Sequence, residues 1–165
     1  MIIKGMGYVQ IQVTEALLRL LSKKPYGKIT VSDIVAEAGI GRASFYRNYI
    51  DKDDVIRKQL RRLILLWHKK AEAELPTNWQ LSLMEHYYEN RDFYLPINQA
   101  GLSYMQLENI LSLAGPKETD SNLEAYFHSL LAYSVFGWII EWMNRGMQES
   151  PKQLSVMMDS LNGNK

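Results

Sequence analysis

The chain has 165 residues, of which 47% are hydrophobic, so it is long enough to bury a sizeable core in one or two small domains. It contains no cysteine, which excludes disulfides and thiolate metal sites. Its 19 basic and 18 acidic side chains nearly cancel, but residues 1–75 hold 14 basic against 8 acidic side chains, whereas residues 76–165 hold 5 against 10.

The first predicted helix covers about residues 11–22, because apolar residues recur there at helical spacing. Val13, Leu17, Leu20 and Leu21 form its inward face. The segment before this helix lacks the long apolar stretch of a signal peptide, so we expect a cytoplasmic protein.

Residues 30–52 predict two short helices joined by a tight turn. Thr30 and Asp33 have the spacing of a capping box, which starts the first of these helices. Gly39 ends that helix, because glycine readily adopts the left-handed conformation that a sharp stop requires. The second helix follows Gly41.

The second helix of this pair carries side chains of the kinds that bind phosphates and base edges. Phe45 and Tyr49 lie four positions apart and form its buried face, while small Ala43 permits a close approach to DNA. In a helix-turn-helix, the second helix lies in the major groove with its N-terminal residues toward the bases. The guanidinium, hydroxyl and amide groups available for this contact belong to Arg42, Ser44, Tyr46, Arg47 and Asn48. The alternative is an ordinary helical hairpin with a solvated polar face.

The excess of basic side chains in residues 1–75 favours the DNA-binding interpretation. A basic first part in an otherwise neutral chain is typical of a nucleic-acid-binding domain attached to a second unit. The alternative is that the basic residues between Arg57 and Lys70 solvate a long helix.

The rest of the chain predicts helices only, because strand-like alternation is absent. A long helix begins near Lys52 and runs toward Glu74, and Pro76 ends it. Gly115 and Pro116 break the chain further on. The other predicted helices cover about residues 79–90, 92–100, 103–113 and 122–145, with a last one that begins at Ser150-Pro151.

The segment 130–143, LLAYSVFGWIIEWM, is apolar on nearly every side. It is too short for a membrane span, which needs about 20 apolar residues, and Glu141 interrupts it. Because a helix that is apolar all round must be buried on several faces, we predict a homodimer formed through this helix and the last one as a four-helix arrangement. The predicted interface residues are Leu130, Tyr133, Val135, Trp142, Leu154 and Met158. The alternative is a fully buried central helix in a monomer.

Residues 11–56 resemble the DNA-binding domain of the TetR/AcrR family of bacterial transcriptional regulators. The resemblance lies in the ITVSDI start, the AGI turn, the SFYRNY helix and the DKDD entry to the next helix. The later segment AYSVFGWIIEWMNRGMQESPKQL is similar to the C-terminal ends of some members. The resemblance implies an all-α fold with an N-terminal three-helix DNA-binding domain, residues 1–51, and a helical ligand-binding and dimerisation domain, residues 52–165, in which residues 52–75 connect the two.

The resemblance also implies roles for single residues. Ser44 and Tyr46 match positions that contact the DNA backbone in family members, and Lys52 matches a lysine that holds a phosphate at a helix N-terminus. The short N-terminal arm departs from the family pattern, because Lys4 is its one charged residue and a strong minor-groove contact is not expected. The expected DNA contacts are Thr30, Ser32, Arg42, Ala43, Ser44, Tyr46, Arg47, Asn48 and Lys52.

The second half of the chain is rich in aromatic side chains and methionine, which line an inducer cavity in many family members. The alternative is that they form packed core, which is the commoner use of such residues. His68, His86 and His128 lack the spacing of metal ligands, and we expect no metal or other cofactor. The expected pocket residues are Trp67, Tyr88, Tyr104, Phe127 and Trp138.

We therefore expect a dimeric, sequence-specific DNA-binding regulator of transcription, a repressor that a small-molecule inducer releases from its DNA operator. The alternative is a family-derived regulator or interaction module that a protein partner controls. The sequence shows no nucleophile, paired acids or metal ligands in the patterns of an enzyme, and we expect no membrane association.

Overall fold

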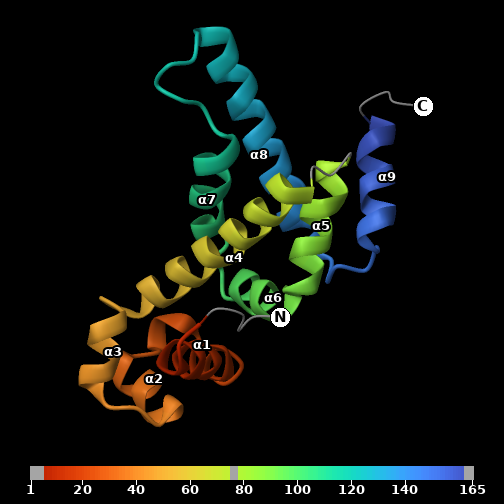
Figure 1. Cartoon of the computed structure of the whole chain (residues 1–165). Helices are drawn as coiled ribbons and strands as arrows, with labels where there is room; N and C mark the ends of the chain where they lie inside the picture. Colours follow the sequence, from red (N-terminus) through yellow and green to blue (C-terminus); the bar gives the residue numbers. More distant parts are fainter. Residues whose placement is uncertain (1–5, 75–77, 162–165) are drawn as a thin grey trace.

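The computed structural model describes residues 6–74 and 78–161, and every regular element within these ranges is helical (Figure 1). The prediction of an all-α fold is confirmed. Lys4 and Pro76, on which two expectations rested, lie outside the described residues. The elements are α1 (Tyr8–Leu21), η1 (Tyr26–Lys28, a 3₁₀ turn), α2 (Val31–Ala38), α3 (Arg42–Asn48), α4 (Lys52–Glu74), α5 (Trp79–Glu89), α6 (Arg91–Gln99), α7 (Tyr104–Ala114), α8 (Asn122–Asn144) and α9 (Pro151–Leu161).

The helices form two groups that α4 connects (Figure 1). Helices α1, α2 and α3 pack against one another at one end of the molecule. The long helix α4 contacts α1 at its beginning and then runs between α5 and α7. Helices α7 and α8 form an antiparallel pair, and α9 lies along α5. Helix α4 therefore contacts helices of both groups, so a displacement of α4 affects both groups directly.

The local signals read from the sequence account for several helix ends. Gly39 has a φ of 64° at the end of α2, as the predicted glycine stop requires. At the start of α9, Ser150 and Gln153 cap each other, since the Ser150 N–H donates to Gln153 Oε1 over 2.9 Å. Helix α1 begins earlier than predicted, because the Gly7 N–H donates to Gln10 Oε1 over 3.2 Å. The 3₁₀ turn η1 was not predicted.

Helix α8 is apolar on two opposite sides, of which the structure buries only one. Ala132, Val135, Ile139, Trp142 and Met143 are buried inside the chain. Large apolar side chains on other sides remain exposed by 55–79%, and we call them the exposed face of α8: Leu123, Tyr126, Phe127, Leu130 and Tyr133. Among the described residues, α8 is the one helix long and apolar enough to cross a membrane by length and composition, and 17% of its most apolar stretch is buried inside the chain.

This arrangement divides the predicted dimer residues into two groups. Leu130 and Tyr133 lie on the exposed face of α8. The other four predicted residues are at most 8% exposed because they pack within their own chain: Val135, Trp142, Leu154 and Met158. Their place in a dimer interface stays a prediction.

Candidate nucleic-acid interface

The corner between α2 and α3 is built by caps and a glycine turn. The Asp33 N–H donates to Thr30 Oγ1 over 3.1 Å, and the Thr30 N–H donates to Asp33 Oδ2 over 2.7 Å, which completes the predicted capping box. Hydrogen bonds from Lys24 and Thr30 lower the pKa of Asp33 to about 2, so the cap stays ionised at neutral pH. Ile40 then turns the chain into α3, and its N–H donates to the Val35 carbonyl over 3.1 Å.

Phe45 fixes α3 on the core and leaves its polar side outward. Phe45 is fully buried, and Tyr49, at the end of the helix, is 4% exposed. The opposite side of α3 carries Arg42, Ala43 and Tyr46, all of which are exposed. The prediction that Phe45 and Tyr49 are the core contacts of this helix is confirmed.

Arg42 joins α3 to the beginning of α2. Its Nη1 donates to Ser32 Oγ over 2.7 Å, and its Nη2 lies 3.4 Å from the hydroxyl oxygen of Tyr46. The guanidinium also lies over the Tyr46 ring, 5.8 Å from the ring centroid. These contacts bring three of the expected DNA-binding side chains together at the N-terminal end of α3, where a recognition helix meets base edges.

A second group forms one turn later on α3. Arg47 Nη2 donates to Ser44 Oγ over 2.9 Å, and Asn48 Nδ2 donates to the Ser44 carbonyl over 2.8 Å. Arg47 is exposed, whereas Ser44 and Asn48 are half-buried. The two arginines therefore lie on the outer side of α3, each held by a neighbouring hydroxyl.

Lys52 is half-buried and is bonded to its own chain. Its Nζ donates to the backbone carbonyls of Tyr26 and Ile29, each over 2.9 Å, and lies 4.2 Å from the centroid of the Tyr26 ring. This geometry fastens the start of α4 to η1 and uses two of the three N–H groups of the ammonium. Lys52 therefore has a structural role, and the phosphate contact that the resemblance implies stays a prediction.

Thr30 has a similar restriction. Its hydroxyl donates to Asp33 Oδ2 over 2.7 Å while it accepts the Asp33 N–H, so its only proton is already in use. The structure therefore contains the helix cap that the sequence predicts for Thr30. Ser32 differs, because its hydroxyl accepts from Arg42 and keeps its own proton available.

Lys58 is a basic residue near the recognition helix that the sequence did not single out. Its Nζ donates to the Asn48 carbonyl at the end of α3 over 2.7 Å and pairs with Asp54 Oδ2 over 2.9 Å. Its side chain is still 53% exposed. The spacing of four residues from Asp54 was visible in the sequence, but the carbonyl partner was not. Lys58 thus links α4 directly to α3.

The histidines pair with separate groups. His68 Nε2 lies 3.2 Å from Glu72 Oε1, and His128 Nδ1 lies 2.7 Å from Asp120 Oδ2. His86 is buried, and its Nε2 lies 2.9 Å from the hydroxyl oxygen of Tyr94. Within residues 6–74 and 78–161, no three His, Cys, Asp or Glu side chains gather as a metal site.

The expected pocket residues do not meet in one cavity. Trp67 lines a pocket of about 230 Å³ between α4, α5, α7 and α8, while Phe127 and Trp138 line a neighbouring pocket of about 220 Å³. Tyr104 is 53% exposed and lines neither pocket. Tyr88 stacks on the buried Trp142 with a centroid distance of 6.1 Å.

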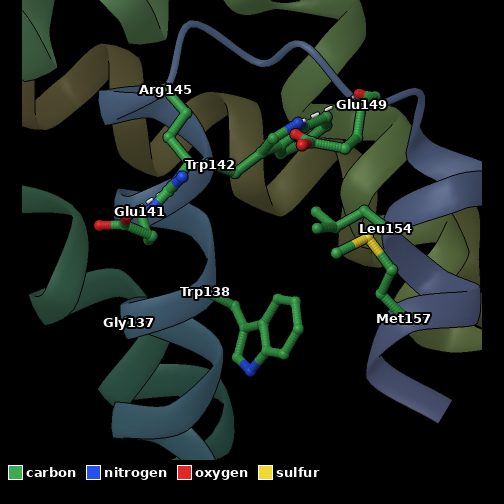
Figure 2. A pocket seen from close by; sticks show the side chains of 8 residues that line it. All are labelled: Gly137, Trp138, Glu141, Trp142, Arg145, Glu149, Leu154 and Met157. Carbon is green, nitrogen blue, oxygen red and sulfur yellow. Dashed lines mark hydrogen bonds and ion pairs between the residues drawn. The ribbon is translucent and has the colours of Figure 1, made fainter. Parts of the chain in front are cut away.

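A third pocket of about 370 Å³ lies between the last turns of α8 and helix α9 (Figure 2). Trp138 from α8 and Met157 from α9 face the gap (Figure 2). Glu141 and Arg145 at its edge are paired with each other over 2.6 Å. The indole N–H of Trp142 donates to the Glu149 carbonyl over 3.1 Å and closes one end of the pocket.

Two family models match the chain. Residues 13–58 match the bacterial regulatory proteins of the tetR family, and residues 102–163 match a transcriptional regulator C-terminal region. Between them the two matches cover more than half of the chain. No curated protein matches it.

The fold is also similar to solved structures. These include the fatty acid degradation regulator FadR from Bacillus halodurans, with 15% identity, 96% of each chain covered and a TM-score of 0.58. A TetR transcriptional regulator from Streptococcus agalactiae 2603V has 18% identity over 91% of this chain and 92% of that one, with a TM-score of 0.54. The dihydroxyacetone kinase operon activator DhaS has 19% identity over 93% of each chain, with a TM-score of 0.52. At these identities the similarity shows a shared fold and nothing more.

A helix-turn-helix with an exposed polar recognition helix, joined by α4 to a second group of helices, defines a DNA-binding regulator of transcription. The chain belongs to the TetR family of transcriptional regulators.

Proposed function

We propose that the chain acts as a homodimer that places two α3 helices on two half-sites of one operator. The observation that carries this proposal is the exposed face of α8, where five large apolar side chains are 55–79% exposed. A contiguous apolar surface of this kind marks an interaction site. Val156 and Met157 on α9, the second helix of the predicted four-helix arrangement, are also about half exposed.

We propose a second copy of this chain as the occupant of this surface. A two-fold axis makes one apolar patch complementary to itself, and two copies supply the pair of recognition helices that a two-fold symmetric operator requires. The pocket between α8 and α9 lies beside this surface and accepts apolar side chains of the other copy. Glu124, His128 and Glu141 on α8 make the helix a poor fit to lipid, and a protein that regulates bacterial transcription belongs in the cytoplasm.

We propose that Ser32 on α2 and the outer side of α3 contact DNA. Arg42 and Arg47 are the base-reading or phosphate-binding side chains, supported by their exposure and by the hydroxyls that orient them. Ala43 allows close approach, and Tyr46 with Ser44 contacts the backbone. Lys58 adds positive charge at the end of α3. The domain division that fits this role places residues 1–51 on the DNA and residues 52–165 in regulation.

We propose that the protein represses transcription and that a small molecule releases it. Helix α4 supports this mechanism, because it lines the pocket that Trp67 faces and also holds α3 through the bond from Lys58 to the Asn48 carbonyl. Half-sites one helical turn apart require a spacing of about 34–36 Å, so a small rotation of α4 changes the fit to DNA. DhaS is an operon activator, so the direction of control has to be measured with a promoter reporter.

The test of the dimer is the substitution Leu130→Glu in the exposed face of α8, with Leu65→Glu on α4 as the matched control. Leu130 is 68% exposed and Leu65 is 49% exposed, so both substitutions leave the core intact. Light scattering during gel filtration should show a dimer for the native chain and for Leu65→Glu, and a monomer for Leu130→Glu. A dimer that persists in Leu130→Glu, or a native chain that is monomeric and binds a different protein through α8, contradicts the proposal.

A further inference from the structure

Arg42 is held between α2 and α3 by two hydroxyl groups. Its Nη1 donates to Ser32 Oγ near the start of α2 over 2.7 Å, and its Nη2 lies 3.4 Å from the hydroxyl oxygen of Tyr46, one turn further along α3. The guanidinium also lies over the Tyr46 ring. Contacts on two different helices restrict the rotation of this long side chain, so binding to DNA costs less conformational entropy.

The charge of Arg42 is not neutralised by a carboxylate in the described part of the chain. Arg19, Arg57 and Arg145 each pair with a carboxylate, at distances of 2.6–3.8 Å. The polar partners of Arg42 are hydroxyls instead. Two of its five N–H groups face these hydroxyls, so the other three remain to donate to a further acceptor. Arg42 therefore presents oriented donors and a positive charge on the exposed side of α3.

A guanidinium distinguishes among the four bases because it donates hydrogen bonds and cannot accept them. On its major-groove edge, guanine presents two neighbouring acceptors, the carbonyl oxygen O6 and the ring nitrogen N7. Adenine presents one acceptor beside an amino group, cytosine presents an amino group, and thymine presents one acceptor beside a methyl group. Arg42 lies in the first turn of α3, the part of a recognition helix that meets base edges. Guanine is therefore the base that can accept two hydrogen bonds from this side chain.

Arg47 has the same chemistry in a different place. It lies in the last turn of α3, and its Nη2 donates to Ser44 Oγ of the same helix over 2.9 Å. Because the N-terminal residues of a recognition helix are the ones that meet base edges, a phosphate is the partner that fits the place of Arg47. A phosphate contact carries no sequence information. The two arginines therefore form a matched pair for experiments.

We propose that Arg42 reads a guanine in each half-site of the operator by donating to O6 and N7, and that Ser32 positions Arg42 for this contact. The presence of an operator rests on the proposed function, whereas the identity of the base is inferred from the donors, the charge and the place of Arg42. The Ser32 hydroxyl accepts from Arg42 and keeps its own proton for a neighbouring phosphate.

The base is tested first on the native protein. DNA that binds it is selected from a random pool, and its guanines are replaced one at a time by 7-deazaguanine, which lacks the ring nitrogen N7. One such replacement in a half-site should weaken binding about five-fold, and the same replacement should have no effect on Arg42→Ala. Hypoxanthine, which lacks only the amino group on the minor-groove edge, should change binding less than about two-fold at this position. Equal effects of 7-deazaguanine on the native protein and on Arg42→Ala overturn the proposal.

Arg42→Gln tests the assignment in the other direction. A glutamine amide carries a donor beside an acceptor, which matches adenine. Selection with Arg42→Gln should therefore replace guanine by adenine at that one position and change the preference between the two bases about ten-fold or more. Arg47→Gln, the matched control, should weaken binding to both bases equally. With both variants shown to be folded by circular dichroism, an unchanged guanine preference in Arg42→Gln, or a switch in Arg47→Gln instead, overturns the proposal.

The positioning role of Ser32 has its own readout. Ser32→Ala should lower the preference for guanine over adenine about three-fold or more, and Ser32→Thr, which keeps the hydroxyl, should retain it. The readout is the ratio of two affinities, because a general loss of structure or of a phosphate contact weakens binding to both bases. An unchanged ratio in Ser32→Ala overturns the positioning role.

Failure of this inference and failure of the proposed function give different results. Selected DNA that contains no guanine dependent on Arg42 overturns the inference alone. A native protein that selects no DNA sequence from the pool contradicts the proposed function, and the inference with it.

Discussion

His86 provides a test of the buried packing between α5 and α6. Its side chain is 8% exposed and lies beside Tyr94, which is 1% exposed. Burial lowers the pKa of His86 from 6.5 to about 4, because the charged imidazolium would lose its hydration. Between these two values the unfolded chain binds a proton that the folded chain does not. Stability from this site is therefore present above pH 6.5 and is lost as the pH falls toward 4.

The magnitude follows from the pKa difference. The pKa difference of about 2.5 between the unfolded and the folded chain lowers the free energy of unfolding by about 3 kcal/mol once His86 is protonated in both states. Between pH 7.5 and pH 5 the loss is about 2 kcal/mol. His86→Gln keeps a polar partner for the Tyr94 hydroxyl but does not titrate, so it should remove this part of the pH dependence. The pKa values of Asp33, Glu37, Asp120 and Glu124 are all lowered, so these carboxylates titrate mainly below the pH range of the experiment.

The assay is urea unfolding at pH 7.5 and pH 5 at one fixed protein concentration, since oligomerisation makes stability depend on concentration. His68→Gln is the matched control, because the His68 side chain is 44% exposed and is paired with Glu72. The native chain and His68→Gln should lose about 2 kcal/mol more than His86→Gln on acidification. The same loss in all three proteins would refute the reasoning, since it would show that His86 is protonated in the folded state.

Two further predictions concern the DNA interface. Arg42→Ala should weaken binding to a selected DNA by about 1–3 kcal/mol and relax the base preference at one position. Competition titration against single-base variants measures both effects, with Arg57→Ala on α4 as the control. Full retention of the base preference would leave Arg42 a phosphate role at most. Lys52→Met should lower the free energy of unfolding by about 2 kcal/mol, because two backbone carbonyls lose a charged donor. The slope of DNA affinity against salt concentration in Lys52→Met tests the phosphate contact separately: a decrease of about one unit supports that contact, and an unchanged slope contradicts it.

The sequence was most informative where the interaction is local. The capping box of Thr30 and Asp33, the glycine stop at Gly39 and the start of α9 at Ser150 each depend on residues within a few positions. Apolar spacing at Phe45 identified the buried side of α3, and the proposed DNA contacts lie on its exposed sides. These signals were sufficient for the helices and for the recognition helix.

Contacts whose partner is distant in sequence could not be predicted. The sequence did not reveal the bonds from Lys52 Nζ to the backbone carbonyls of Tyr26 and Ile29, because a carbonyl leaves no mark in the sequence. Helix α8 was difficult for another reason: a helix that is apolar all round does not indicate which of its sides is covered. Only the packing of the other helices showed that Leu130 faces outward while Trp142 faces the core.

The central claim is that the exposed face of α8 pairs two copies and so sets the spacing of two α3 helices. Hydroxyl-radical footprinting on a selected DNA fragment tests this claim most directly. We predict two protected half-sites on one face of the duplex, centred about 10 base pairs apart or a multiple of that distance. In Leu130→Glu we predict that the paired protection disappears at concentrations that saturate the native protein. A single protected half-site under the native protein, or an unchanged pair under Leu130→Glu, would contradict the claim.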